Sequence, residues 1–318
     1  MTTPAQRFAT PAQIEQDIFN FKLDQQKNGR ANETIRSRIQ SLRQVAQLCD
    51  INDPEIVKLW LSDTKNEHHF EKPCTWNNKT KTKFVDTYAA YMRYKQLQWT
   101  KPSYAITAKL PFIPTEQEID QLIASCGNLT AAVLQTLKET GMRIGELTQL
   151  KPIDIDPQRK TVNVTPEKGS NPRILPISDK LIAMLNNLTR DPRATYTTVF
   201  QPHKDTLRDY LCNQRKAAAQ KLGNPRLAQI GFHTLRHWKG TMLYHETKDL
   251  RHVQKILGHK QITSTVIYEN TACALWLQET DNFTCKVAHN EPEETELIET
   301  GFQHVNNREG LAFYKKRK

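Results

Sequence analysis

The chain has 318 residues, of which 37% are hydrophobic and 8% aromatic, so it can bury about two domain cores and a wholly disordered protein is excluded. It contains no run of about 18 apolar residues and no export signal at its N-terminus, so we expect a cytoplasmic protein without membrane contact. The net charge is +11, made up of +5 over residues 1–105, +7 over 106–286 and −1 over 287–318. A basic excess on two domains suits a polyanion contacted by both, and a merely basic protein is the alternative.

Residues 11–100 carry apolar side chains at helical spacing and predict a bundle of about four helices. We expect Asn32 to cap the second helix. Asp53 and Pro54 should open the third, because proline at the first helical position loses no hydrogen bond. The fourth is expected over roughly residues 82–98.

Three lysines that alternate with threonine precede this fourth helix, namely Lys79, Lys81 and Lys83. Lysine side chains and the free amides of a helix N-terminus both bind phosphate groups. We therefore expect these lysines to contact DNA. A solvated basic turn is the alternative interpretation.

Residues 101–114 contain three prolines and no helical period, which is typical of a linker. A capping box of Thr115 and Glu118 then opens a second domain. Its second helix should end at Gly141, a residue suited to the left-handed position after a helix. Two β-rich runs, KTVNV and RILPI, flank Gly-Ser-Asn-Pro and predict a hairpin. Further helices are expected over residues 179–188, 204–222, 234–246, 249–258 and about 263–278.

The overall prediction is a mainly α protein with a small β-sheet. We expect a helical domain over residues 1–100, a linker over 101–114, a mixed α+β domain over 115–286 and an extension over 287–318. The extension should contain one helix and a hairpin around Asn-Arg-Glu-Gly, and we assign it no role. The six cysteines lack metal-ligand spacing, so we expect reduced thiols, no metal and no other cofactor.

Four short segments of the second domain carry residues suited to phosphate chemistry. They are TGMRIGEL with Arg143 and Glu146, PEKGSNP with Lys168, FHTLRHW with His233 and Arg236, and LGHKQITSTVIYEN with His259 and Tyr268. In this order and spacing they resemble the catalytic pattern of the tyrosine recombinases, the phage-integrase and Xer-type family. Within that family, HWKGTM and the short C-terminal hairpin resemble archaeal members.

The resemblance covers about residues 110–285 and implies a catalytic domain preceded by a core-binding domain that clamps DNA. It implies a site-specific recombinase or integrase that works through a 3′-phosphotyrosine intermediate on double-stranded DNA. The family acts as a homotetramer on paired sites, exchanges strands through a Holliday junction and can use accessory DNA-binding proteins. The same resemblance makes Arg143, Lys168, His233, Arg236, His259 and Tyr268 the expected catalytic residues, with Glu146 in support.

The residue types suit phosphodiester transfer without a metal. Arg143 and Arg236 can hold the non-bridging phosphate oxygens by bidentate hydrogen bonds, and His259 can add a further donor. Tyr268 can attack the phosphate if it loses its proton, and His233 is the candidate base, with Glu146 balancing the charges around it.

The departing 5′ oxygen needs a proton, and Lys168 on the hairpin is the candidate general acid. Read singly, each of these residues is ordinary, and only their conjunction predicts a recombinase. A type IB topoisomerase and a non-catalytic DNA-binding protein are the alternatives.

Gly240 stands where many family members carry alanine, and we expect this to loosen its helix by about 1 kcal/mol without contacting a catalytic group.

Overall fold

The computed structural model describes residues 10–68, 70–167, 169–189, 197–276, 283–308 and 311–317. The chain divides into two compact units, residues 1–108 and 109–318. Within the described ranges, no helix is both long enough and apolar enough to cross a bilayer.

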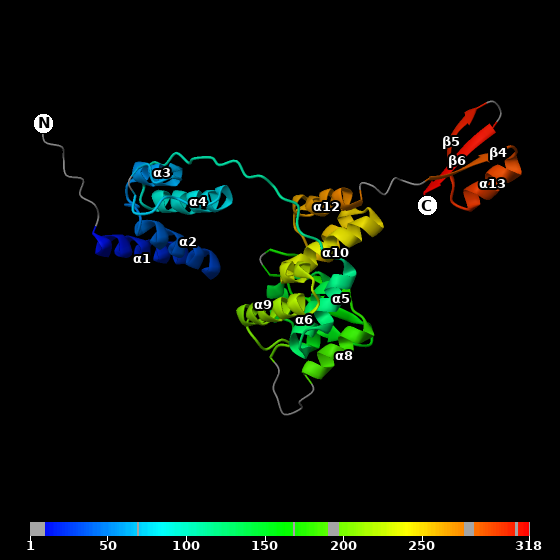
Figure 1. The fold of residues 1–318 in the computed structure, drawn as a ribbon, viewed down its shortest axis with the longest axis horizontal. Coiled ribbons are helices and arrows are strands. Elements are labelled where there is room, and N and C mark those ends of the chain that lie inside the picture. Colours follow the sequence, from blue (N-terminus) through cyan, green and yellow to red (C-terminus); the bar gives the residue numbers. More distant parts are fainter. Residues whose placement is uncertain are drawn as a thin grey trace. The chain divides into compact units, whose positions relative to one another are not determined.

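The N-terminal unit is a four-helix bundle, blue to cyan in Figure 1. Its helices are α1 (Pro11–Lys27), α2 (Asn32–Ala46), α3 (Pro54–Ser62) and α4 (Asn78–Tyr94). Aromatic rings fill much of its core, with Trp60 against Trp76 and Phe84 against Tyr88. Such rings bury large apolar areas, so a short bundle can hold a defined core.

The predicted helix starts in this unit are partly corrected. Asp53 caps α3 as expected, accepting hydrogen bonds from the amides of residues 55 and 56. Asn32 is wrong as a cap, because it is already the first residue of α2. The fourth helix starts at Asn78 rather than near 82, because the side chain of Asn77 accepts from the Thr80 amide and closes the first turn earlier.

The body of the second unit surrounds α6, which is buried on nearly all sides. Around it lie α5 (Glu116–Ala124), α8 (Asp179–Leu188) and α10 (Phe232–Thr247). A small antiparallel sheet of order β1-β2-β3 shares the same hydrophobic core through Val162, Val164 and Leu175. The elements are α5, α6 (Asn128–Thr140), α7 (Ile144–Thr148), β1 (Ile155–Asp156), β2 (Thr161–Val164), β3 (Arg173–Pro176), α8, α9 (Lys204–Lys221), α10, α11 (Leu250–Leu257) and α12 (Val266–Trp276), with 3₁₀ turns at Pro152–Asp154, Pro225–Gln229 and Ile262–Ser264.

Local signals set several boundaries of this body. The Thr115–Glu118 capping box is present, and Gly141 ends α6 in the left-handed conformation at φ 62°. β2 and β3 form the predicted hairpin, with Val162 opposite Leu175. Helix α10 begins at Phe232, two residues before its predicted start, which places His233 inside its first turn.

The C-terminal residues form a small sheet of order β4-β6-β5 with one helix. Its elements are β4 (Phe283–Ala288), α13 (Glu291–Glu299), β5 (Gln303–Arg308) and β6 (Leu311–Arg317). The helix and hairpin match the expectation. Strand β4 runs across residues 286 and 287, where we expected the extension to begin, and pairs with β6, Cys285 lying opposite Lys315.

Candidate active site

Helix α10 places the buried Arg236 at the centre of the second unit's body. Its guanidinium donates to the carbonyl oxygens of Gly141 and Leu257, each at 2.7 Å. These carbonyls lie at the C-terminal ends of α6 and α11, where backbone acceptors lack helical partners. Burial, followed by the positive charge of Arg143, lowers the pKa of Arg236 to about 10. Three helices therefore hold this cation in one orientation.

Arg143 lies at the start of α7 beside a carboxylate that two arginines approach. Its Nη1 donates to Ser170 Oγ at 2.7 Å and lies 3.5 Å from Glu146 Oε1. Glu146 is buried and binds Arg173 at 2.7 and 3.2 Å, and it also accepts from the Arg143 amide at 2.9 Å. Burial would raise the pKa of Glu146, but the hydrogen bonds from Arg173 and the Arg143 amide outweigh it and keep the pKa below its usual value.

The segment between β2 and β3 is attached to the turn after α11. The Asn171 amide and Ser170 Oγ both donate to the Gly258 carbonyl at 3.0 Å. Gly258 has φ 70°, and a Cβ there would lie 2.8 Å from Arg173 Nη1. Glycine is required at this turn because both its conformation and its close neighbours exclude a side chain. Gly258 directly precedes His259, so the hydrogen bonds to its carbonyl connect the hairpin to the segment that carries this histidine.

Tyr268 lies buried on α12, which packs against α10 of the same chain. Its ring is nearly parallel to that of His259, with 6.1 Å between centroids, and lies 5.8 Å from His237. The ring also packs on Gly240, which corrects our expectation for this glycine, because Tyr268 is one of the residues we expect to be catalytic. Burial raises the pKa of Tyr268, while the charges of Arg236 and Arg143 oppose that rise.

Three histidines around these arginines are held neutral. Burial and the charges of Arg236 and Arg143 lower the pKa of His259 to about 3, and its Nδ1 lies 2.9 Å from Thr265 Oγ1. Burial and the neighbouring His233 lower the pKa of His237 to about 4. Desolvation, followed by Arg236 and Arg143, also lowers the pKa of His233. A neutral imidazole can accept a proton at physiological pH.

A cavity of about 290 Å³ opens beside this cluster and is lined by Arg143, Glu167, Arg208 and His233, with Met142, Ile144, Gly145 and Phe232. Arg208 reaches it from α9, where it also pairs with Asp205 at 2.6 Å. The two arginines outnumber the one carboxylate, Glu167, in this lining, which favours an anion. The cavity can hold a phosphate next to the neutral imidazole of His233.

The structure therefore brings Arg143, Glu146, His233, Arg236, His259 and Tyr268 into one region. Lys168 lies outside the described residues. Two further residues escaped the sequence analysis. Arg173 sits in RILPI, where strand periodicity could have marked it as an inward-facing charge, whereas Arg208 carries no local signal.

The three lysines near the fourth helix are not equivalent. Lys79 and Lys83 are exposed in the first turns of α4. Lys81 is buried, its ammonium donates to the Leu61 carbonyl at 2.5 Å, and it lies 5.4 Å from the centroid of the Tyr104 ring. The expectation that Lys81 contacts DNA is therefore corrected, because its charge is used inside its own unit.

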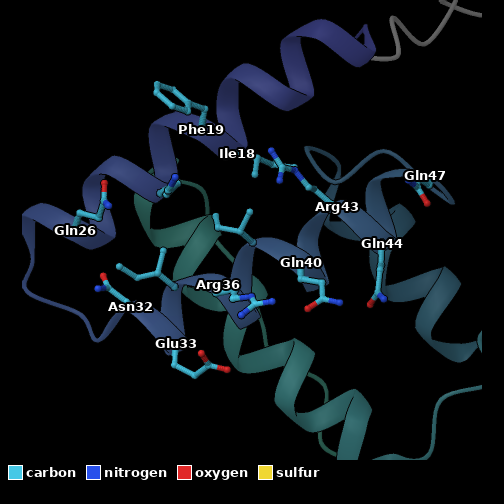
Figure 2. A pocket seen from close by; sticks show the side chains of 13 residues that line it. Ile18, Phe19, Gln26, Asn32, Glu33, Arg36, Gln40, Arg43, Gln44 and Gln47 are labelled. Carbon is cyan, nitrogen blue, oxygen red and sulfur yellow. The ribbon is translucent and has the colours of Figure 1, made fainter. Parts of the chain in front are cut away.

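The N-terminal unit also has a groove of about 940 Å³ between α1 and α2, shown in Figure 2. Its base is apolar, and its α2 side carries Arg36, Gln40 and Gln44. A second groove of about 240 Å³ joins Gln40 and Gln44 to Thr80 and Lys83 of α4. One face of α2 thus presents arginine and amide side chains next to an exposed lysine.

Comparison with known proteins identifies the family. Residues 114–274, just over half of the chain, match the model of the phage integrase family. A putative integrase/recombinase, y4qK, of Sinorhizobium fredii is 34% identical over 52% of this chain and 56% of its own length. Tyrosine recombinase XerA of Thermococcus kodakarensis is 27% identical over 61% of this chain and 71% of its own length. The archaeal relative is thus no more similar than the bacterial one.

The fold has solved counterparts. The Tn1549 transposon integrase in complex with transposon right end DNA superposes with a TM-score of 0.62 at 14% identity, over 82% of this chain and 98% of that one. The fold is therefore that of the tyrosine recombinases, a helical domain followed by a mixed α+β domain. The chain spans little more than half the length of the first curated relatives that it matches.

Proposed function

The chain belongs to the phage integrase family of tyrosine recombinases, and we propose that it cuts and rejoins duplex DNA at specific sites through a 3′-phosphotyrosine intermediate. One observation carries the proposal. Arg143, His233, Arg236, His259 and Tyr268 come from three separate segments of the sequence, yet they lie close enough together to shift one another's pKa values.

In the proposed reaction Arg143 and Arg236 bind the non-bridging oxygens of the scissile phosphate. The transition state carries more negative charge on these oxygens than the ground state, so fixed guanidinium groups stabilise it selectively. The carbonyl ligands of Arg236 support this role, because they orient the guanidinium without neutralising it. His259 adds a donor through Nε2 in the tautomer whose Nδ1 accepts from the Thr265 hydroxyl.

Tyr268 then attacks phosphorus, its hydroxyl proton passes to the neutral His233, and the bond to the 5′ oxygen breaks. The departing 5′ oxygen takes a proton from a general acid, a role we assign to Lys168. A 5′-hydroxyl from another strand reverses these steps and restores the phosphodiester, so the bond energy is conserved in the tyrosyl ester. Glu146 acts indirectly by fixing Arg173 and the Arg143 backbone.

The packing of α12 on α10 favours attack in cis, with each chain supplying its own Tyr268. We further propose that four protomers assemble on two DNA sites and exchange strands in pairs through a Holliday junction, with accessory DNA-binding proteins as additional partners. A type IB topoisomerase-like relaxation of supercoils by a monomer is the competing activity for the same site.

We propose that the N-terminal unit holds DNA through the polar face of α2 and the exposed lysines of α4. Gln40 and Gln44 offer the amide geometry that can read adenine, while Lys79 and Lys83 suit phosphate. Replacing Lys83 with glutamine should weaken binding to all sequences and reduce the salt slope of log K by about 1. Replacing Lys81 should leave that slope unchanged and lower stability instead.

The decisive experiment uses nicked suicide duplexes prepared as a pool from the source genome, in buffer with EDTA, resolved on denaturing gels. Wild type should give a covalent protein–DNA band, Tyr268→Phe should give none, and sequencing the trapped DNA should identify the site. Binding without any covalent band would contradict the proposal and favour a DNA-binding protein. Relaxation of plasmid by isolated monomers would favour the topoisomerase activity.

A further inference from the structure

Gly240 on α10 lies against the hydroxyl-bearing end of the Tyr268 ring. A Cβ at residue 240 would lie 2.8 Å from Cζ and 2.9 Å from both Cε atoms of the Tyr268 ring. Carbon atoms in favourable contact are about 3.5–4.0 Å apart, so this space cannot hold a methyl group unless the ring moves. The three atoms are the carbon that bears the hydroxyl and its two ring neighbours, so a methyl group would displace the nucleophilic end of the side chain.

Helix formation gives no reason for this glycine. Gly240 lies in the interior of α10, where glycine is about 1 kcal/mol less favourable than alanine. The structure gives it no positive φ, in contrast to Gly141 and Gly258. Many family members carry alanine at the corresponding position, so the close approach of the tyrosine ring is a feature of how this chain packs α12 on α10, and it is this approach that requires glycine here.

The surroundings restrict how the ring could adapt. The rings of His259 and His237 flank Tyr268, and Val253 and Leu257 of α11 pack with it in a small cluster. Tightly packed groups of this kind tolerate added volume poorly. The relief open to a larger residue at 240 is therefore a shift of α12 away from α10, which would carry the hydroxyl away from Arg236.

We propose that Gly240 is a positioning residue for the nucleophile, which lets the phenol end of Tyr268 lie against α10 beside Arg236 in its own chain. The inference rests on the proposed function for its catalytic consequence, whereas its geometric part holds independently of DNA. A misplacement of about 1 Å at a reacting centre can cost about 100-fold in rate.

A double-mutant cycle without DNA tests the geometry. Gly240→Ala should lower the Tm when Tyr268 is present and raise it in a Tyr268→Ala background, because only the helix preference for alanine then remains. Gly127→Ala is the matched control, since nothing lies within 4 Å of its added Cβ. A rise in Tm from Gly240→Ala in both backgrounds would overturn the proposal.

Nitration by tetranitromethane reports the displacement even if the Tm values do not separate. Mass spectrometry should find Tyr268 protected in wild type relative to Tyr210, which is 43% exposed, and at least threefold more nitrated in Gly240→Ala. Equal protection of Tyr268 in both proteins would contradict the proposal.

The catalytic consequence is measured on the substrate trapped by wild type. Gly240→Ala should slow single-turnover covalent complex formation by about 10- to 100-fold at saturating protein, with the Kd for that DNA within twofold of wild type. Gly127→Ala should leave both values unchanged. If wild type forms no covalent complex, the proposed function fails while the Tm cycle still decides the geometry. An unchanged rate together with a positive Tm cycle would restrict Gly240 to packing and overturn the positioning role.

Discussion

The buried arginines at the two ends of the site, the hairpin end with Arg173 and the tyrosine end with Arg236, have different partners for their positive charge. At the hairpin end, Arg173 is buried against Glu146, which also approaches Arg143. At the tyrosine end, Arg236 is equally buried but binds two backbone carbonyls, and no salt bridge to it is found among the described residues. At the first end, the carboxylate of Glu146 balances the charge of Arg173, whereas the second end keeps a cation whose counter-charge must come from outside.

This contrast suggests different roles for the two arginines: an arginine paired with a carboxylate is suited to holding the site together, and one bound by carbonyls is suited to binding an anion. A carboxylate partner fixes an arginine but also cancels its field, so the Glu146 pair suits the role of a support. Carbonyl partners fix orientation through partial charges only and leave the full positive charge available. The three neutral histidines also leave the charge of Arg236 without a competing cation, because a protonated histidine next to Arg236 would repel it.

The largest effect should come from breaking the balanced end. Glu146→Gln leaves Arg173 buried without its counter-charge and should lower the free energy of unfolding by about 3–5 kcal/mol, measured by urea denaturation. Glu15→Gln removes the exposed pair with Arg43, both side chains being 54% exposed, and should cost at most about 1 kcal/mol. Equal costs for the two variants would remove the distinction between the ends.

At the tyrosine end, a change to Arg236 should lower the rate of covalent complex formation. Arg236→Lys keeps the charge but loses the planar fork, so covalent complex formation should slow by about 10²–10³-fold, measured on the trapped substrate. Arg43→Lys, at an exposed position, serves as the control and should react at the wild-type rate. A fully active Arg236→Lys protein would show that point charge alone is sufficient at this position.

The neutral histidines predict acid sensitivity. Their folded pKa values lie below the ordinary 6.5, so between pH 6.5 and 4 the unfolded chain binds protons that folded His237 and His259 do not. Stability should therefore fall as the pH falls, by up to about 1.4 kcal/mol per pH unit for each histidine. His237→Gln should flatten the slope of unfolding free energy between pH 6.5 and 4, and His252→Gln, at an exposed position, should not.

The smallest effect should come from the connection between the ends. Ser170 accepts from Arg143 and donates to the Gly258 carbonyl. Ser170→Ala should cost about 1–2 kcal/mol of stability and lower the rate less than Arg236→Lys does. Ser41→Ala, which removes a hydrogen bond to its own helix in the N-terminal unit, is the comparison. A Ser170→Ala protein as impaired in rate as Arg236→Lys would mean that the ends do not act separately.

Much of the fold could be predicted because its signals are local. The cap at Asp53, the box at Thr115 and the left-handed Gly141 each depend on residues within one turn, and each was found where predicted. The order of the site residues was likewise readable as a motif. The start of α4 was placed too late because Asn77 was not recognised as its cap.

The missing parts depend on contacts distant in sequence. Arg173 meets Glu146 across 27 residues, and Lys81 reaches the Leu61 carbonyl across 20, so neither partner is visible in a local pattern. The same holds for Gly240, because the residue that requires glycine there, Tyr268, lies on another helix. β4 was missed because its pairing partner, β6, lies near the end of the chain.

The ligands of Arg236 also bear on the biosynthesis of the protein. Its two carbonyl partners lie 95 residues before it and 21 residues after it, so the guanidinium is oriented only once α6, α10 and α11 have met. A nascent chain that has not yet emerged past residue 257 lacks the second of these carbonyls and cannot hold Arg236 in this orientation. The guanidinium is therefore oriented only after most of the second unit has been synthesised.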